Sequence, residues 1–515
     1  MTAGAVPAAA PVAARWHSVC PLEDILPDSG AAVLIDGKQI AVFRIRDAVF
    51  AIGNYDPASD ANVLARGIVG DVGDVGGEIV VASPIYKQHF SLITGQCVEE
   101  PRFAVPAYMA EVRHGHIWVR AKPVVQRHSG RKPRLVVVGN GMAAMRAVEE
   151  LLRLAPQTYD MTVFGAGDQR IEDIVTHPPE WYGERGITLH REDPVTHIDR
   201  VRRCVRSHRG VQAPYDRLLI ATGSLPILLP IPGRDLEGVS TFLDLRDVDT
   251  MLAASPAPAR AVVIGGGLLG LEAASGLQQR GLDVTVVHIQ RYLMERELDV
   301  PAAELLRAEL ERRGLQFKMA ATTSHLCGET RVSGVAFADG SELPADLVVI
   351  AVGVRPNTEL AGAAGLPCDR GLLVDDTMLT YDPAIYAVGE CVQHRGKIFG
   401  LVAPLLEQAR VCAAHLAERG TRGYRESPLS TQLRITGINV FSAGNVDTGP
   451  GVESLVLRDP KRGIYKRLVI SEDRIRGAVL YGDVRDSAWY LDLMNAGRDI
   501  HTFRDELLFG APQSR

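Results

Sequence analysis

The stretch VVVGNGMAA at Val136–Ala144 decides the first part of the fold, and the stretch VVIGGGLLG at Val262–Gly270 repeats its pattern. Each stretch places a β-branched run before closely spaced glycines, and a helical pattern follows. Glycine permits a tight turn from strand to helix and lets a ligand approach the backbone closely. At the start of a helix, free N–H groups and the helix dipole favour a negatively charged group such as a phosphate. Each stretch therefore predicts a strand, a phosphate-binding turn and a helix.

Two such stretches in one chain predict two dinucleotide sites. One glycine motif alone is a weak signal, because the same residues also form tight packing turns without a ligand. Two motifs, each in the strand-to-helix context, most simply bind a flavin and a nicotinamide that exchange a hydride. Hydride transfer depends on fixed geometry rather than on a proton donor, so the sequence predicts no particular catalytic residue.

The composition indicates a globular chain of several domains. Its 515 residues are 46% hydrophobic and 23% charged, which suits three or four domains with ordinary cores. The net charge of −6 provides no basic surface, so no nucleic acid partner is expected. No apolar run approaches the roughly 20 residues that span a bilayer, so no membrane contact is expected. The seven cysteines are scattered without a Cys-x-x-Cys pair, which is typical of a reducing cytoplasm.

The regions before and after the two glycine motifs do not show the strand-turn-helix pattern of the motifs. In the N-terminal region, short alternating runs flank Asp36-Gly37, which is a strong hairpin signal, and helical periodicity is nearly absent. A stretch that contains Pro123 and Pro133 then predicts a linker. From Tyr424 onward, separated strand and helix patterns predict a distinct α+β segment.

Together these features resemble the pyridine-nucleotide-dependent FAD oxidoreductases. Besides the two glycine motifs, the matching stretches are ATG at Ala221–Gly223, AVGVRPN at Ala351–Asn357 and YAVGEC at Tyr386–Cys391. Further stretches are similar to the flavoprotein half of the large subunit of assimilatory NAD(P)H nitrite reductase: PPEWY at Pro178–Tyr182, VH at Val287–His288, LMER at Leu293–Arg296, TGI at Thr436–Ile438 and FSAG at Phe441–Gly444. The N-terminal module is similar to the small subunit of that enzyme, a Rieske-type β fold, at NYDP (Asn54–Pro57) and ASPIYKQHF (Ala82–Phe90).

The resemblance implies a multidomain fold. An N-terminal all-β Rieske-like domain precedes two Rossmann-type α/β dinucleotide-binding domains of the glutathione-reductase type, and a small α+β domain follows. The predicted segments are a disordered leader at 1–14, the Rieske-like domain at 15–120, a linker at 121–133, the first part of the FAD-binding domain at 134–245, the NAD(P)-binding domain at 246–355, the second part of the FAD-binding domain at 356–420 and the C-terminal α+β domain at 421–515.

The resemblance also implies which residues hold the two cofactors, FAD and NAD(P)H. For FAD, the first motif cradles the pyrophosphate, a Thr-Gly pair passes close to the flavin and a Gly-Glu pair binds the ribityl or phosphate end; these residues are Gly139, Gly141, Ala144, Thr222, Gly223, Gly389 and Glu390. For the nicotinamide cofactor, the second motif cradles the pyrophosphate and a further glycine faces the cofactor's path; these residues are Gly265, Gly267, Gly270 and Gly353.

His288 takes the place where an acidic residue would grip the ribose of NAD. With Arg291 nearby, it could accept the 2′-phosphate of NADPH, although the family also has histidine here while using NADH. An ordinary surface loop is a third interpretation of the same residues. The sequence therefore leaves the choice between NADH and NADPH open.

The Rieske-like module departs from the pattern of a cluster-bearing domain. Such a domain has Cys-x-His at one place and Cys-x-x-His at a second. This chain has Asn54, Asp56, Ser83 and Tyr86 at those places. Because a [2Fe–2S] centre needs four Cys or His ligands, the sequence predicts no metal site.

The first dinucleotide unit also departs from the family. After Phe164-Gly165-Ala166 the family has a glutamate that bonds the FAD ribose, whereas this chain has Gly167 and then Asp168. A following segment that lines the flavin in the family is absent. Asp168 is the candidate replacement for the missing carboxylate, and the alternative is that FAD binding is weakened or lost.

These features predict a cytoplasmic NAD(P)H oxidoreductase that passes electrons from FAD to a partner metalloprotein. In the family, the large subunit continues into iron–sulfur and sirohaem-binding segments, whereas this chain ends soon after Gly510, which favours an electron-input component. The expected partner is a sirohaem and iron–sulfur nitrite reductase or a nitrate reductase component, with homodimerisation left open. Two alternatives remain: a reductase for rubredoxin or ferredoxin, and a flavin-less assembly or regulatory protein that kept the fold.

Overall fold

The computed structural model describes residues 15–511, except residues 47, 73–77, 101–102, 124–131, 167–176, 243–258, 420–422, 427–429, 434, 436 and 448. The predicted leader and most of the predicted linker lie outside the described residues. The chain forms two compact units. The first comprises Met1–Gly223, Asn357–Phe399 and Leu405–Arg425, and the second comprises Ser224–Pro356, Gly400–Pro404 and Glu426–Arg515.

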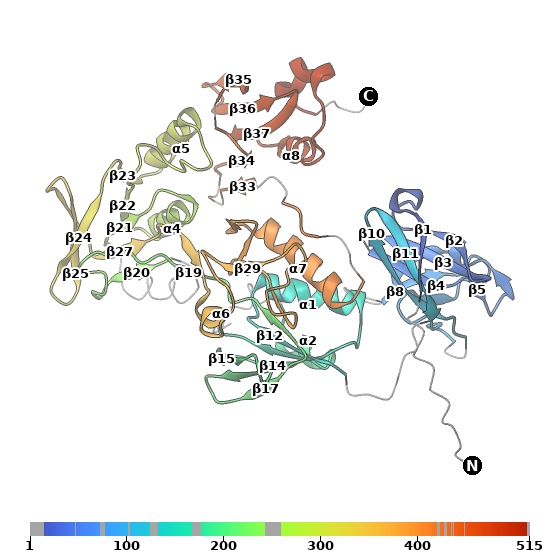
Figure 1. The fold of residues 1–515 in the computed structure, drawn as a ribbon. Coiled ribbons are helices and arrows are strands. Elements are labelled where there is room, and N and C mark those ends of the chain that lie inside the picture. The colour runs from blue at the N-terminus through green and yellow to red at the C-terminus, as the bar shows by residue number, and fades with distance from the viewer. Residues whose placement is uncertain are drawn as a thin grey trace, which may run out of the picture. The chain divides into compact units, whose positions relative to one another are not determined.

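The N-terminal module of the first unit is all-β, which confirms the prediction (Figure 1). Its antiparallel main sheet has the order β1-β11-β10-β4-β3-β2, formed by β1 (Trp16–Pro21), β2 (Ser29–Ile35), β3 (Lys38–Ile45), β4 (Ala48–Gly53), β10 (Ala107–Arg113) and β11 (His116–Pro123). A second sheet contains β7 (Ile68–Val72), β8 (Glu78–Ala82) and β9 (His89–Ser91). A separate short pair is formed by β5 (Tyr55–Asp56) and β6 (Ala61–Asn62). Strand β4 is buried throughout, because Phe50 and Ile52 face one core while Val49 and Ala51 face another.

The first unit also contains a parallel sheet of five strands in the order β14-β13-β12-β18-β30. The strands are β12 (Arg134–Val138), β13 (Asp160–Phe164), β14 (Thr188–His190), β18 (Arg217–Ile220) and β30 (Ile385–Ala387). The chain adds β13 and β14 on one side of β12 and then returns to its other side for β18, so the strand order reverses between β12 and β18. In open α/β sheets, ligands bind beyond the carboxyl ends of the strands at such a reversal. The first glycine motif follows β12 at this point.

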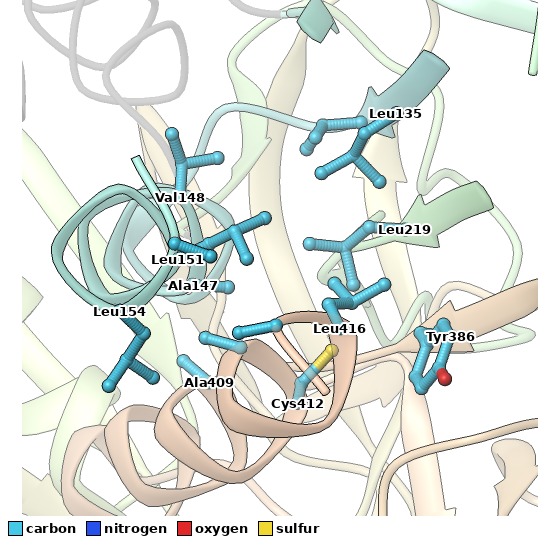
Figure 2. Close-up of a cluster of buried hydrophobic side chains, with 14 of the residues drawn as sticks. Leu135, Ala147, Val148, Leu151, Leu154, Leu219, Tyr386, Ala409, Cys412 and Leu416 are labelled. Atoms are coloured by element: carbon cyan, nitrogen blue, oxygen red, sulfur yellow. The ribbon is translucent and has the colours of Figure 1, made fainter. Parts of the chain in front are cut away.

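Helices α1 (Met142–Leu154) and α7 (Val402–Leu416) pack against this sheet. Figure 2 shows Ala147 and Leu151 of α1 and Leu416 of α7 pointing toward Leu135 of β12 and Leu219 of β18. Full burial of each leucine side chain stabilises the fold by about 2 kcal/mol. The other α-helices and strands described for this unit are α2 (Pro179–Glu184), α6 (Glu359–Ala363), β15 (Val195–Asp199), β16 (Cys204–Ser207), β17 (Gln212–Pro214), β29 (Leu372–Val374), β31 (Val392–His394) and β32 (Lys397–Ile398).

The second unit contains another parallel sheet, in the order β20-β27-β21-β22-β23. The strands are β20 (Val239–Thr241), β21 (Arg260–Ile264), β22 (Asp283–Val287), β23 (Gln316–Lys318) and β27 (Leu347–Ile350), and the helices are α4 (Leu268–Gln279) and α5 (Val300–Arg312). Here the order reverses between β21 and β27, and the second glycine motif follows β21. Smaller sheets are formed by β24 (Thr323–Gly328), β25 (Val332–Phe337) and β26 (Glu342–Pro344), and by β19 (Ser224–Pro226) with β28 (Val354–Pro356).

The C-terminal part of the second unit is the predicted α+β domain. Its antiparallel sheet has the order β33-β34-β37-β36-β35, formed by β33 (Ser430–Gln432), β34 (Val440–Gly444), β35 (Glu453–Asp459), β36 (Ile464–Ser471) and β37 (Arg474–Tyr481). One face of the sheet packs on α8 (Ser487–Asn495), with Leu480 against Tyr490, and the other packs on α5, with Val479 and Tyr481 near Leu310. The sheet is therefore covered on both faces.

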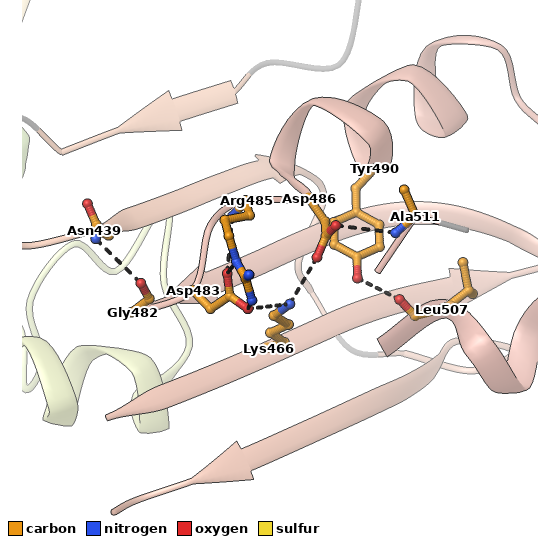
Figure 3. A network of polar contacts seen from close by, with 9 residues as sticks. All are labelled: Asn439, Lys466, Gly482, Asp483, Arg485, Asp486, Tyr490, Leu507 and Ala511. Atoms are coloured by element: carbon orange, nitrogen blue, oxygen red, sulfur yellow. Dashed lines mark hydrogen bonds and ion pairs between the residues drawn. The ribbon is translucent and has the colours of Figure 1, made fainter. Parts of the chain in front are cut away.

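A buried lysine holds the end of this sheet to the segment before α8 (Figure 3). Lys466 lies on β36 and is only 4% exposed. Its Nζ atom lies 3.0 Å from a carboxylate oxygen of Asp483 and 3.1 Å from one of Asp486. Arg485 binds the same Asp483 through two further hydrogen bonds. A buried ammonium group is tolerated here because two carboxylates compensate its charge.

We expect this network to make the stability of the protein sensitive to acid. Hydrogen bonds from Arg485 lower the pKa of Asp483, burial opposes them, and Lys466 lowers the pKa further. Because the folded pKa lies below the unfolded value of about 3.9, the stabilisation is present above that value and is lost as the pH falls. The free energy of unfolding in urea, measured between about pH 6 and pH 3, is expected to fall more steeply for the wild type than for Asp483→Asn. Equal slopes would contradict the assignment.

Candidate nucleotide-binding sites

The first glycine motif forms the turn from β12 to α1. Gly139 has a φ of 109°, and a side chain there would place its Cβ 2.2 Å from the carbonyl oxygen of Ala221. Gly141 is the N-cap of α1. Among the described residues, no side chain caps the helix, and a Cβ at Gly141 would meet no atom within 4 Å apart from those of its own stretch of chain. The turn therefore leaves the first N–H groups of the helix without a side-chain cap, beside space that an anion can occupy.

The second glycine motif repeats this geometry between β21 and α4. Gly265 has a φ of 129°, and its Cβ would lie 2.2 Å from the carbonyl oxygen of Ala351. Gly267 is the N-cap of α4, and within the part of the chain that the structure describes no side chain caps this helix and no atom beyond the neighbouring residues lies within 4 Å of a Cβ. A Cβ at Gly270 would lie 2.0 Å from Gly265 O, so this helix packs more closely on its turn than α1 does, where Ala144 is accommodated and fully buried.

Thr222 and Gly223 continue from β18 at the same edge of the first sheet. Thr222 donates its hydroxyl hydrogen bond to the carbonyl of Asn357 at 2.8 Å, and the Asn357 N–H donates to Gly223 O at 2.9 Å. These bonds fix the Thr-Gly pair to the chain where it re-enters the first unit. The pair is thereby held beside the cradle formed by the first glycine motif, where Gly139 approaches Ala221.

The second FAD motif follows β30, the next strand of the same sheet. Gly389 has a φ of 95°, and its Cβ would lie 3.2 Å from Ala143 of α1. Its N–H donates to Oε1 of Gln408, a fully buried residue of α7, at 2.9 Å. Among the described residues, Nε2 of Gln408 has no hydrogen-bond partner. Sequence reasoning missed Gln408, although an amide on an apolar helix face near a glycine motif was an available signal. The neighbouring Glu390 is half-buried.

These features fit FAD at the pyrophosphate end of the site. The structure brings together, at the carboxyl edge of the first sheet, seven of the predicted residues: Gly139, Gly141, Ala144, Thr222, Gly223, Gly389 and Glu390. The cradle at Gly141 and the unpartnered donor of Gln408 are what a bound polar group would require. Asp168, the candidate replacement carboxylate, lies outside the described residues.

The predicted nicotinamide-site residues gather at the carboxyl edge of the second sheet. Gly353 follows β27 with a φ of 114°, and its carbonyl accepts a hydrogen bond from the Ile227 N–H at 3.0 Å. Gly265, Gly267 and Gly270 lie beside it, at the strand reversal. His288 follows β22 but is only 6% exposed. The imidazole is bound within the protein rather than displayed as part of a surface loop.

In the Rieske-like module, the four places that would hold cluster ligands do not fit a [2Fe–2S] cluster. Asp56 and Ser83, both fully buried, are joined by a hydrogen bond of 2.6 Å between their side chains. Asn54 binds the side chain of Gln39 and the N–H of Ala65. Burial would raise the pKa of Asp56, but hydrogen bonds to its carboxylate lower it below the usual value. The two loops are thus held by a satisfied polar network that offers no sulfur or imidazole ligand.

Across the parts of the chain that the structure describes, no group of three or more His, Cys, Asp or Glu side chains could hold a metal ion. In the same parts, every helix is too short or too polar to span a membrane.

Two parallel sheets, each with a glycine cradle at its strand reversal, define a two-dinucleotide α/β oxidoreductase. Residues 133–415, over half of the chain, match the pyridine nucleotide-disulphide oxidoreductase family, and the chain belongs to this family. Its cofactors are FAD and NAD(P)H. Residues 15–120 match the Rieske-like [2Fe-2S] domain, and residues 430–498 match the rubredoxin NAD+ reductase C-terminal domain.

Relatives of known name agree with the predicted resemblance. The chain is 45% identical over 385 residues to a nitrite reductase [NAD(P)H] of Bacillus subtilis, covering 72% of this chain and 48% of that protein. It is 40% identical over 394 residues to the assimilatory nitrate reductase electron transfer subunit of the same organism, covering 73% of this chain and 51% of that protein. The chain therefore spans about half the length of these relatives. The structure of a covalent putidaredoxin reductase–putidaredoxin complex is similar with a TM-score of 0.64 and 25% identity, covering 72% of this chain and 94% of that one.

Proposed function

We propose that this chain transfers electrons from NAD(P)H, through FAD, to a redox partner protein of nitrite or nitrate assimilation. The observation that carries the proposal is the pair of uncapped helix starts at Gly141 and Gly267, each at the strand reversal of its own sheet. When bound, FAD would accept two electrons as a hydride and release them one at a time to the partner protein. The chain's own residues fix the two nucleotides by their pyrophosphates and hold the Thr222-Gly223 turn rigid.

The choice of partner rests on the similarity to the two Bacillus subtilis proteins and on the Rieske-like module. One of those relatives is named as a nitrite reductase [NAD(P)H], and the other is named as an electron transfer subunit of assimilatory nitrate reductase. We infer a sirohaem and iron–sulfur nitrite reductase, or a nitrate reductase component, as the electron acceptor. All seven cysteines are free thiols, which is consistent with a cytoplasmic location. Homodimerisation stays a prediction.

A second candidate function is a reductase for rubredoxin or ferredoxin. The match of residues 430–498 to the rubredoxin NAD+ reductase C-terminal domain favours it, as does the likeness to a reductase solved with putidaredoxin. The two candidates share the cofactors and differ only in the acceptor. The identity of the acceptor therefore decides between them.

The experiment uses the full-length protein, purified without added flavin. We expect visible flavin absorption bands, their bleaching on anaerobic addition of NAD(P)H, and reduction of ferricyanide. Acceptor proteins are then compared at equal concentration: a nitrite or nitrate reductase component from the native host, a rubredoxin and a ferredoxin. Faster reduction of rubredoxin or ferredoxin would favour the second candidate. Binding of NAD(P)H without flavin and without ferricyanide reduction would instead support the assembly or regulatory alternative.

A further inference from the structure

In a Rossmann-type site, the residue after the strand that follows the glycine motif and its helix contributes to the choice of nicotinamide cofactor. In this chain that strand is β22. An acidic residue there, about 20 residues after the glycines, hydrogen-bonds the adenosine ribose of NAD. In this chain the position holds His288, which has no negative charge. The structure shows that a carboxylate is nevertheless present beside it.

The imidazole of His288 connects the phosphate-binding turn to Glu295. The N–H of Gly266 donates to Nδ1 at 3.1 Å, so Nδ1 carries the lone pair and the ring proton sits on Nε2. Nε2 lies 3.0 Å from Oε2 of Glu295 and donates to it. The uncharged imidazole of His288 therefore links Gly266 to Glu295, and the negative charge is on the Glu295 carboxylate.

The segment that carries Glu295 is fixed to the same turn. Met294 donates its N–H to the carbonyl of Gly266 at 3.0 Å, and both Leu293 and Met294 are buried. A Cβ at Gly266 would lie 2.7 Å from Cγ of His288 and 2.9 Å from Cδ2 of Leu293. The N–H of Gly266 thus holds His288, and its carbonyl holds Met294. The position of the Glu295 carboxylate therefore depends on the nucleotide-binding turn.

The exposure of the two side chains separates their roles. The side chain of His288 is 7% exposed, whereas that of Glu295 is 30% exposed. The ring is covered by protein, and the carboxylate can still be reached from outside. Arg291, the other residue considered for a 2′-phosphate, is exposed.

From this geometry we infer that Glu295 takes the role of the missing acidic residue and makes the site selective for NADH over NADPH. The carboxylate accepts hydrogen bonds from the adenosine ribose hydroxyls, and its charge repels a 2′-phosphate. This inference rests on the proposed function only in that the second site binds a nicotinamide dinucleotide. It replaces the hypothesis that His288 and Arg291 bind the 2′-phosphate of NADPH.

The test measures binding of NAD+ and NADP+ to the full-length, flavin-loaded protein by isothermal titration calorimetry, with no electron acceptor present. We expect the wild type to bind NAD+ more tightly than NADP+. In Glu295→Gln, which keeps an acceptor for His288 but removes the charge, the ratio of the two affinities is expected to fall about tenfold to hundredfold, the usual worth of a hydrogen bond to a charged group. Glu295→Asp, which keeps the charge, is expected to retain most of the preference.

Asp283→Asn is the matched control, because it removes one carboxylate from the start of β22, at the end of that strand away from His288. Its affinity ratio is expected to equal that of the wild type. Equal binding of NAD+ and NADP+ by the wild type, or an unchanged ratio in Glu295→Gln, would overturn the inference and leave the proposed function intact. If the wild type instead preferred NADP+ and Arg291→Ala lost NADP+ binding, the hypothesis that His288 and Arg291 bind the 2′-phosphate would be established. Failure of both coenzymes to bind would overturn the inference and the proposed function together.

Discussion

Gly141→Val is expected to give a folded protein that retains less FAD than the wild type. Gly141 has extended backbone angles (φ −74°, ψ −179°), which valine adopts readily. Apart from its neighbours in the chain, no atom of the described residues lies within 4 Å of its Cβ position. The side chain therefore fits the chain but fills the space beside the uncapped helix N–H groups. We expect FAD affinity to fall about fivefold to hundredfold, because an overpacked contact costs about 1–3 kcal/mol. The loss of the N-cap glycine costs the fold about 1 kcal/mol.

Gly267→Val is the matched control, since Gly267 has nearly the same angles (φ −86°, ψ −173°) and equally open surroundings. This variant is expected to remain yellow but to lose its reduction by NAD(P)H. Visible spectra give the flavin content, and photoreduction shows that the retained flavin is still redox-active. The assignment of the two cradles is wrong if Gly141→Val keeps wild-type flavin content, or if Gly267→Val is the variant that loses it.

Asp299→Ala is expected to destabilise the second unit by about 3–5 kcal/mol, the usual effect of removing one partner of a buried ion pair. Asp299 is the N-cap of α5 and accepts the N–H of Ala302 at 3.3 Å. Its other oxygen accepts hydrogen bonds from Tyr465 at 2.5 Å and from Arg467, which is only 7% exposed, at 3.1 Å. The substitution removes the cap and leaves a buried guanidinium group without its carboxylate.

Urea unfolding, followed by circular dichroism, measures this effect. Asp299→Asn keeps an oxygen acceptor and removes the charge, so its destabilisation is expected to be smaller. Asp235→Ala, at a side chain that is 91% exposed, is expected to change the free energy of unfolding by less than about 0.5 kcal/mol. A similar small change in Asp299→Ala would show that α5 and β36 are not joined through this carboxylate.

Local sequence patterns predicted the parts of the fold that depend on near neighbours. The β-branched runs before the glycines became β12 and β21, and the Asp36-Gly37 turn joins β2 to β3 with both residues at positive φ. The all-β, α/β and α+β order was confirmed. The absence of iron ligands was also visible in the sequence, because ligand identity is a property of single residues.

Contacts between distant segments could not be predicted in the same way. Tyr386 pairs with Leu219 in the first sheet, and Gln408 reaches Gly389 from α7. The sequence placed His288 correctly after a strand but could not show that its ring turns toward Gly266, because that depends on the path of the following loop. The pairing of Asp299 with Arg467 likewise follows from the packing of α5 on the C-terminal sheet. The role of Asp168 stays a prediction.

The bond between Asp56 and Ser83 has a consequence for how the N-terminal module matures. A domain whose loops are closed by a metallocofactor must wait for the cell's assembly machinery and is vulnerable to oxidants that dismantle it. Here a carboxylate and a hydroxyl supplied by the polypeptide itself join the same two loops. We expect this module to reach its native state during iron starvation, when a module that needs iron to close its loops does not.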